Sequence, residues 1–289
     1  MPIIRKRRTL SIMRLLTALG PLRQRRRIPK QKQPDRLRRE YLGAITPFVR
    51  TATAEFDKVR GEVVALLELE RERREQGVKQ DASNKDRAKQ LVERAAVRAA
   101  AAWAPRELYA AASRYAKRTN DFQKEQLGRQ VSAAMGVSLA AIEPTITVKI
   151  EEFAARNVDL IKTVPERYFD RLRLDVEEAF DTGMHPSTLA EIFEERDGMA
   201  ENDARRIARD QIGKLNGQLN EARQTGMGVT GYTWRTANDN RVRDEHADRE
   251  GQHYEWSDPP EDGHPGEAIQ CRCFAEPDLG PILEGLDPV

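Results

Sequence analysis

Residues 231–277 read GYTWRTANDNRVRDEHADREGQHYEWSDPPEDGHPGEAIQCRCFAEP. This segment holds two of the three tryptophans, three of the four histidines and both cysteines of the 289-residue chain. Tyr232 and Trp234 alternate with small polar residues as in a half-buried strand, and a charged stretch with proline and glycine punctuation follows. The segment therefore predicts a compact module with a strand, loops and a defined surface or site.

The rest of the chain has apolar residues at three- and four-residue steps, the spacing of amphipathic helices. The aromatic share is only 6% and the charged share 33%, which favours long, solvated helices over one thick globule. The sequence therefore predicts a mainly α protein: an elongated helical bundle, preceded by an extended basic arm and followed by a small C-terminal α+β module. The expected helices cover about 41–76, 85–103, a third that starts at Pro105, 119–143, 146–161, 165–180, 188–196 and 200–226.

Charge is distributed very unevenly along the chain. Fourteen of the 49 basic residues but only two of the 47 acidic residues lie in residues 1–40, so this segment carries a net charge of +12 and the remainder −10. Pro21, Pro29 and Pro34 and the density of arginine predict a flexible arm there. The residues expected to bind a partner are Arg5, Lys6, Arg7, Arg8, Arg23, Arg25, Arg26 and Arg27.

Two partners suit such an arm equally well. A cationic segment can neutralise the phosphates of DNA or RNA with release of counterions, or it can become ordered on an acidic protein surface. The expected organisation is the arm at 1–40, a helical region at 41–143, a domain at 144–277 and a tail at 278–289. Within the domain, helices occupy 144–226 and the strand and loop module 227–277.

The cysteine spacing and the hydropathy indicate the cellular compartment in which the chain is made. Cys271 and Cys273 are one residue apart, and a disulfide between them would close a small, strained ring, so synthesis in a reducing cytoplasm is expected. The sequence contains no run of eighteen apolar residues, and no transmembrane helix or membrane partner is expected.

The cysteines and nearby histidines supply the ligand types of a zinc site. The candidate ligands are His246, Cys271, Cys273 and His264. Their spacing is not that of a zinc finger, because Cys-x-Cys places two ligands on one extended segment and the histidines do not follow the His-x₃₋₅-His rule. The alternative is that the cysteines are small buried apolar residues and that His246 is a hydrogen-bonded structural residue.

An enzymatic interpretation is a metal-dependent nuclease. His246 is accompanied by Asp244, Glu245 and Asp248, which could pair a general base with carboxylate ligands, while the basic arm holds DNA. Against this, the carboxylates lie in a highly charged segment where exposure is the usual state, and no second catalytic motif accompanies them.

Further polar and aromatic residues of the segment have two interpretations each. Asp239, Arg241 and Arg243 are expected in salt-bridged surface networks, together with Arg235 and Arg272, rather than as phosphate readers. Trp234 is expected in the core of the module, and Trp256 is the better candidate for an interface. In the last long helix, the polar residues expected either to face solvent or to hydrogen-bond to the module are Asp210, Gln211, Asn216 and Asn220.

The ordered constellation of residues in the module resembles the C-terminal signature of the phage Mu F-like minor head proteins. The matching residues are Trp234-Arg235-Thr236, Asp239, Arg241-Val242-Arg243, His246, Gly251, Trp256, Pro259-Pro260, His264-Pro265-Gly266 and Cys271-Arg272-Cys273. A single Cys-x-Cys would mean little, whereas this order within about forty residues is fairly specific. The likeness continues upstream through residues 157–162, 207–211, Asn216 and Asn220, and covers roughly the second half of the chain.

The resemblance implies a structural virion protein that is assembled in the host cytoplasm and carried in the phage head. Its expected partner is the portal protein, with the major capsid or scaffolding protein and packaged DNA as further candidates, and its expected roles are head morphogenesis and DNA packaging or delivery. Relatives sometimes carry C-terminal toxin or transferase domains, whereas sixteen residues follow Cys273 here. No enzymatic activity is therefore expected.

Overall fold

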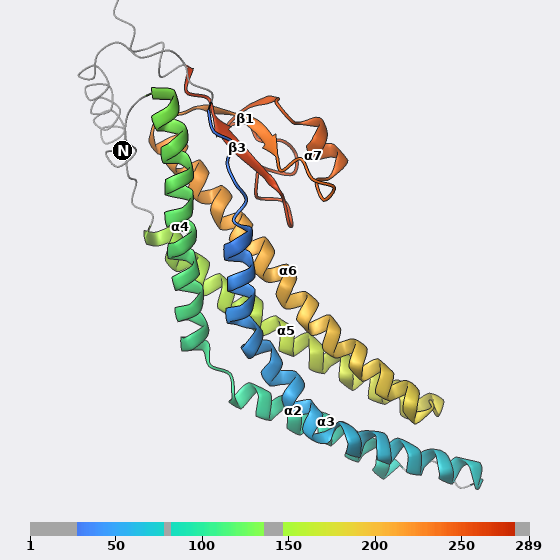
Figure 1. The fold of residues 1–289 in the computed structure, drawn as a ribbon. Helices are drawn as coiled ribbons and strands as arrows, with labels where there is room; N and C mark the ends of the chain where they lie inside the picture. Colours follow the sequence, from blue (N-terminus) through green and yellow to red (C-terminus); the bar gives the residue numbers. More distant parts are fainter. Residues whose placement is uncertain (1–27, 78–81, 136–146, 281–289) are drawn as a thin grey trace, which may run out of the picture. The chain divides into compact units, whose positions relative to one another are not determined.

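The computed structural model describes residues 28–77, 82–135 and 147–280. These residues fold mainly into helices, with one small antiparallel sheet near the C-terminal end (Figure 1). The predicted class, mainly α with a small C-terminal module that contains strands, is therefore confirmed. The elements are α2 (Asp35–Glu75), α3 (Ala82–Ala101), α4 (Pro105–Met135), α5 (Thr147–Thr182), α6 (Pro186–Gly226), β1 (Gly231–Thr236), α7 (Asp244–Asp248), β2 (His253–Glu255) and β3 (Cys273–Pro277).

Several helices that the sequence divides are continuous in the structure. Helix α5 passes through Pro165 and α6 passes through Gly198, where the sequence predicts breaks. An interior proline costs a helix about 3 kcal/mol, but Ile161, Val164 and Tyr168 are buried on both sides of Pro165. Packing of both halves therefore outweighs the local cost. The helix predicted at 119–143 likewise continues α4 as far as Met135, and residues 136–143 lie outside the described part.

The chain folds into two compact units, and each is built from separate stretches of sequence. Among the described residues, 39–77, 82–112 and 154–208 form what we call the helical unit, and 28–38, 113–135, 147–153 and 209–280 form the sheet unit. Helices α4, α5 and α6 each contribute residues to both units. Each unit therefore combines stretches that are distant in the sequence.

The helical unit has an aromatic core. Phe56 packs edge-on against Phe193, with ring centroids 4.8 Å apart, and against Tyr168 at 6.2 Å. Arg196 donates two hydrogen bonds to the carboxylate of Asp175, at 2.8 and 2.9 Å. A charged pair of this bidentate form fixes orientation as well as contributing energy, so α5 and α6 are held in register within this unit.

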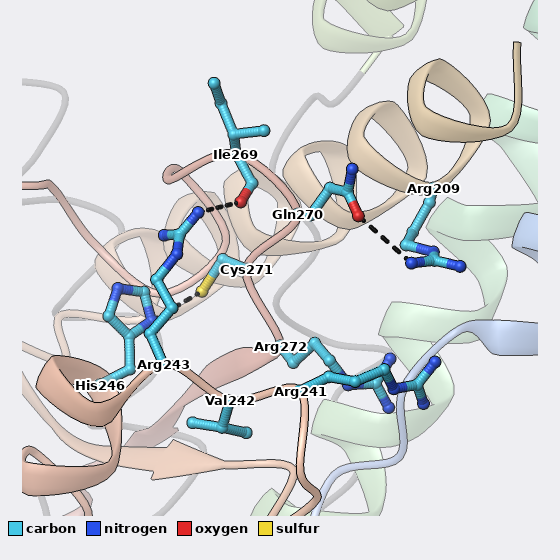
Figure 2. Close-up of a pocket in the computed structure, with 9 residues that line it drawn as sticks. All are labelled: Arg209, Arg241, Val242, Arg243, His246, Ile269, Gln270, Cys271 and Arg272. Atoms are coloured by element: carbon cyan, nitrogen blue, oxygen red, sulfur yellow. Dashed lines mark hydrogen bonds between the residues drawn. The ribbon is translucent and has the colours of Figure 1, made fainter. Parts of the chain in front are cut away.

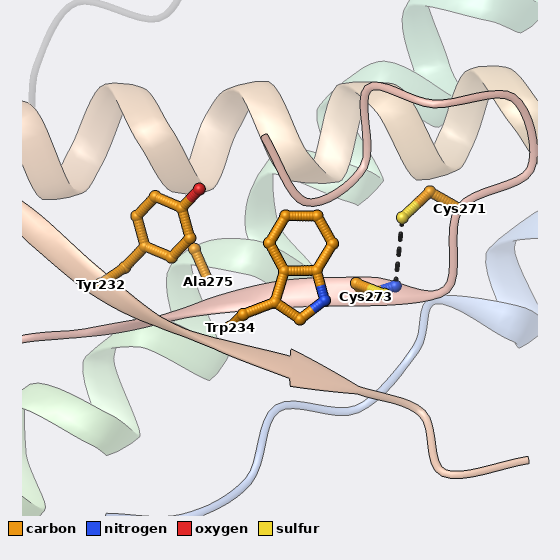
Figure 3. Close-up of a cluster of buried hydrophobic side chains, with 5 residues drawn as sticks. All are labelled: Tyr232, Trp234, Cys271, Cys273 and Ala275. Carbon is orange, nitrogen blue, oxygen red and sulfur yellow. Dashed lines mark hydrogen bonds between the residues drawn. The ribbon is translucent and has the colours of Figure 1, made fainter. Parts of the chain in front are cut away.

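The sheet of the sheet unit has the strand order β2-β1-β3, and both pairings are antiparallel. In β1 the alternation of side chains puts Tyr232 and Trp234 on one face, fully buried. Trp234 lies opposite Ala275 in β3, and these side chains pack in one cluster with both cysteines (Figure 3). The strand and the core position predicted for Trp234 are thus confirmed.

Helix α6 is tied to β3 by buried amide side chains. Asn220 donates a hydrogen bond to the backbone carbonyl of Ala275 at 2.8 Å, and Gln224 donates to the same oxygen at 2.9 Å. The carbonyl oxygen of Asn220 accepts from Gln123 at 2.8 Å and from Gln31 at 3.3 Å. One buried asparagine therefore joins α4, α6, β3 and the segment before α2.

The polar residues of α6 meet the module at two of the four expected positions. Besides Asn220, Asp210 accepts a hydrogen bond from the backbone N–H of Gln270 at 2.8 Å. Gln211 donates to the neighbouring Asp210 instead, and the amide oxygen of Asn216 has no partner among the described residues. The hypothesis is thus confirmed for Asp210 and Asn220 and is wrong for the other two.

The arm expected at residues 1–40 ends earlier than predicted. Helix α2 begins at Asp35, and both Gln31 and Arg38 are buried. Gln31 donates to Gln130 at 2.9 Å, and Gln33 donates to the carbonyl of Arg272 at 2.9 Å. Residues 28–40 are therefore packed structure, held by polar side chains that leave no hydrophobic pattern in the sequence. All eight basic residues predicted to bind a partner lie outside the described residues.

A pair of glycines allows the loop after residue 263 to approach α6 closely. A Cβ added to Gly217 would lie 2.7 Å from the carbonyl oxygen of Pro265 and 3.3 Å from the Cα of Gly266. Gly266 itself has φ of +100°, a conformation that side chains disfavour. The loop that precedes the cysteines is thus positioned by backbone contact with the helix.

The substitution Gly217→Ala should destabilise the protein by about 1–3 kcal/mol, because the new methyl group forces helix and loop apart. Thermal unfolding followed by circular dichroism measures the change. Gly198→Ala in the same helix is the matched control: a Cβ there meets no described atom within 4 Å, so it should stabilise by about 0.5–1 kcal/mol through helix propensity. Equal effects of the two substitutions would contradict the close contact.

Candidate functional site

Three predicted ligands meet in the sheet unit. His246 lies in the short helix α7, Cys271 lies just before β3, and Cys273 begins that strand. The Nδ1 atom of His246 lies 3.6 Å from the Sγ of Cys271 and 3.4 Å from the Sγ of Cys273. All three side chains are buried, and their potential ligand atoms lie within 4.8 Å of one another. We call these residues the His-Cys-Cys cluster.

The second ring nitrogen of His246 is held by an acidic residue. Nε2 lies 2.6 Å from a carboxylate oxygen of Asp262, and Arg249 donates to the other oxygen of that carboxylate. The ring of Trp234 packs edge-on against the imidazole at 5.3 Å, and the Arg249 guanidinium lies over Trp234 at 5.0 Å. The orientation of His246 is thus fixed from both sides.

These contacts shift the pKa values of the cluster. The hydrogen bond with Cys273 lowers the pKa of the Cys271 thiol, against the effect of burial, and the contact with His246 lowers it further. The same contact with Cys271 raises the pKa of Cys273. The contact with Cys271 also raises the pKa of His246. The lowered pKa of Cys271 and the raised pKa of His246 both favour a negatively charged sulfur beside the imidazole.

The acidic residue beneath the histidine is kept ionised. Burial raises the pKa of Asp262, but the hydrogen bonds from Arg249 and His246 outweigh burial and hold that pKa below its usual value. A carboxylate only accepts hydrogen bonds, so Nε2 of His246 carries a proton and Nδ1 is the atom that faces the two sulfurs.

The fourth predicted ligand lies elsewhere. His264 is outside the cluster, and its Nδ1 lies 2.9 Å from the hydroxyl oxygen of Tyr232. The His264 ring packs against Trp256 at 4.8 Å, and Trp256 packs against Tyr232 at 4.4 Å. His264 is a ligand type that lies near the cysteines in the sequence, but the turn at residues 264–267 directs its side chain to the other end of β1. Trp256 is half-buried in this aromatic group, and its role in an interface stays a prediction.

The arginines of the module are engaged in different ways. The Arg272 side chain is only 8% exposed and meets both oxygens of the Asp239 carboxylate, at 2.5 and 3.1 Å. Arg241 also pairs with Asp239, at 3.2 Å. The salt-bridge prediction is thus confirmed for these residues, whereas Arg243 donates instead to the backbone carbonyl of Ile269 at 2.7 Å.

A cavity of about 330 Å³ opens beside the cluster. Figure 2 shows His246, Cys271 and Arg243 on one side of it and Arg209, Arg241 and Arg272 on the other. Arg209 donates to the side chain of Gln270, at 3.2 Å, and Arg243 donates to a carbonyl, so neither is neutralised by a carboxylate of the described residues. The cavity is therefore cationic. Its lining residues are Arg209, Arg241, Val242, Arg243, His246, Ile269, Gln270, Cys271 and Arg272.

The carboxylates of the nuclease hypothesis do not join the cluster. Asp244, Glu245 and Asp248 are exposed, whereas His246 is buried with its ring nitrogens directed at the cysteines and at Asp262. The imidazole is therefore not placed to take a proton from a bound substrate beside those three carboxylates.

Sequence reasoning missed Asp262 and Arg249. Asp262 sits between two prolines and a glycine in a stretch that reads as a turn, and Arg249 is one of many arginines in a charged segment. No spacing rule connects either residue to His246, and only the fold of the loop brings them together.

None of the described helices is long and apolar enough to cross a membrane.

The fold and this site define a mainly helical protein whose C-terminal sheet encloses a buried His-Cys-Cys cluster. Residues 170–276 match the family Phage Mu protein F like protein. The chain thus carries a Phage Mu protein F like domain, within the range 144–277 expected for it. The resemblance inferred from the sequence motifs is confirmed.

A protein of Haemophilus influenzae described as uncharacterized is 37% identical to this chain over 157 residues. The aligned region covers 54% of this chain and 34% of that protein, so the chain matches about a third of the relative's length. No solved structure matches the chain.

Replacing Asp239 by asparagine should destabilise the protein by about 1–3 kcal/mol, because the buried Arg272 loses its closer carboxylate and keeps only Asp35, 3.6 Å away. Chemical denaturation of the purified chain measures the loss. Asp248→Asn serves as control, since Asp248 is exposed and makes no ion pair with the described residues; its effect should stay within about 0.5 kcal/mol. If both variants had the same free energy of unfolding as the wild type, the ion pair of Asp239 with Arg272 would contribute nothing to stability.

Proposed function

We propose that this protein is a minor head protein of a tailed phage or of a related prophage particle, and that it acts in head morphogenesis at the portal vertex. The observation that carries the proposal is the Phage Mu protein F like domain at residues 170–276. The partner is the portal protein, with the major capsid or scaffolding protein as a secondary contact. The role extends to DNA packaging or delivery, and the protein resides in the head.

The sheet module of residues 231–277 is the docking piece in this proposal. It is anchored to α6 through Asn220 and Gln224, so that its outer loops can contact a partner without loss of the fold. Ile269 is 67% exposed on the loop beside the cationic cavity. Exposed apolar residues bordered by arginines are suited to an interface, where apolar anchors contribute affinity and charges contribute orientation.

The proposal includes a structural, non-enzymatic role. The nuclease alternative needs an accessible general base close to carboxylate ligands. His246 is buried, and the nearby exposed carboxylates Asp244, Glu245 and Asp248 make no contact with its ring nitrogens. The geometry supports the structural alternative for these residues. Nicking of plasmid DNA in the presence of Mg²⁺ or Mn²⁺, with loss of nicking in the His246→Ala variant, would contradict this part of the proposal.

The docking surface can be tested with two equally exposed apolar residues. Ile269→Asp should weaken co-sedimentation of the full chain with assembled portal at least about tenfold, because it places a charge in the proposed contact. Leu174→Asp, at a position 65% exposed in α5, should leave binding unchanged. The reverse pattern would place the docking surface on the helices and would contradict the role of the module.

The basic segment can be tested separately from the fold. Because residues 28–40 are packed, the variant should delete residues 1–27 alone. Loss of this segment should weaken retention on DNA or on portal assemblies and reduce the salt dependence of binding, since fewer counterions are released. Parallel titrations with DNA and with portal identify the partner, and unchanged binding to both would show that the segment makes neither contact.

A further inference from the structure

Two sulfur atoms share one nitrogen atom in the His-Cys-Cys cluster. Nε2 of His246 donates to Asp262, so only Nδ1 is left for both Cys271 and Cys273. Nδ1 forms one hydrogen bond, either by accepting from a thiol or by donating to a thiolate. The two sulfurs nevertheless lie at nearly equal distances from it, 3.6 and 3.4 Å, and a hydrogen bond accounts for only one of these contacts.

A metal ion accounts for both. Zinc binds thiolate sulfur at about 2.3 Å and imidazole nitrogen at about 2.0–2.1 Å, and at tetrahedral angles these bonds separate sulfur from nitrogen by about 3.5 Å. The observed distances lie on either side of that value. Both cysteines are free and buried, as thiolate ligands in a protected site would be.

The surroundings of His246 match those of a metal-bound imidazole. Histidine ligands usually donate their second ring N–H to a carboxylate, which fixes the tautomer and orients the ring. Asp262 occupies this position at 2.6 Å and is itself fixed by Arg249. Such a chain of support is expected for a ligand and is more than a buried structural histidine requires.

We propose that Nδ1 of His246 and the thiolates of Cys271 and Cys273 bind one Zn²⁺ ion, with the fourth position open to the arginine-lined cavity. Three protein ligands leave one tetrahedral position for a water molecule. His246 and Cys271 both line the cavity, so water reaches the ion from that side. The ion joins α7 to the start of β3 and thereby closes the module.

Charge and protons balance in this site. Zinc binds the two cysteines as thiolates and His246 as a neutral imidazole, so two protons pass to solvent: that of the Cys273 thiol and the one that Cys271 and Nδ1 share. The two thiolates neutralise the two charges of the ion. No oxidant or reductant takes part.

The test uses the full chain, purified under reducing conditions without chelator. About one zinc ion per chain is expected by elemental mass spectrometry, and chelation should lower the Tm. Replacement of zinc by Co²⁺ should produce a thiolate-to-cobalt charge-transfer absorption in the near ultraviolet. A folded, metal-free protein that shows no such band and no change in Tm on addition of zinc would overturn the proposal and leave a thiolate and imidazolium pair in its place.

Variants assign the ligands. Cys271→Ser and Cys273→Ser should each abolish the charge-transfer band or reduce it strongly, and Asp262→Asn, which changes a positioning residue, should weaken zinc binding about 10–100-fold in competition with a coloured chelator. His253→Ala is the matched control, because that histidine is exposed and outside the cluster; it should retain zinc fully. Loss of zinc from His253→Ala, or its full retention in both serine variants, would contradict the assignment.

Discussion

The sheet unit depends on the backbone carbonyl of Ala275, which accepts hydrogen bonds from both Asn220 and Gln224. A sheet of three short strands is stable only when its apolar face is buried. Its buried face, Tyr232 and Trp234, therefore packs within the module against Tyr254, Trp256 and Ala268. The two amides fix where along α6 the strand lies. A shift of β3 along α6 would leave both amides without this acceptor, and a buried amide that loses its partner costs about 1–3 kcal/mol. No other placement of the strand on the helix is therefore equally stable.

The same anchoring positions the His-Cys-Cys cluster. Cys273 begins the strand that contains Ala275, and Cys271 ends the loop whose close approach to α6 requires Gly217 and Gly266. Helix α7 then needs only to bring His246 above the strand, where Trp234 supports its ring. The cluster thus forms where three separately fixed segments converge, and a metal ion bound there would join segments that packing already places correctly.

The sequence predicted those parts of this arrangement that depend on local pattern. The alternation around Tyr232 and Trp234 indicated β1, the helical spacing indicated α6, and the residue types at His246, Cys271 and Cys273 indicated the cluster. It failed where the determining contacts are distant in sequence: His264 turns to Tyr232, Asp262 turns to His246, and Gln31 packs through its amide group rather than an apolar side chain. Polar contacts of this kind have no periodicity, so a single sequence does not display them.

Cryo-electron microscopy of the head-to-tail vertex, in particles with and without this protein, tests the central claim that the sheet module is a docking piece anchored on α6. The account predicts density for β1, β3 and the Ile269 loop against the portal, present only in particles that contain the protein. Absence of the polypeptide from purified particles, or contact with the portal through the helical unit while the module faces away, would contradict it.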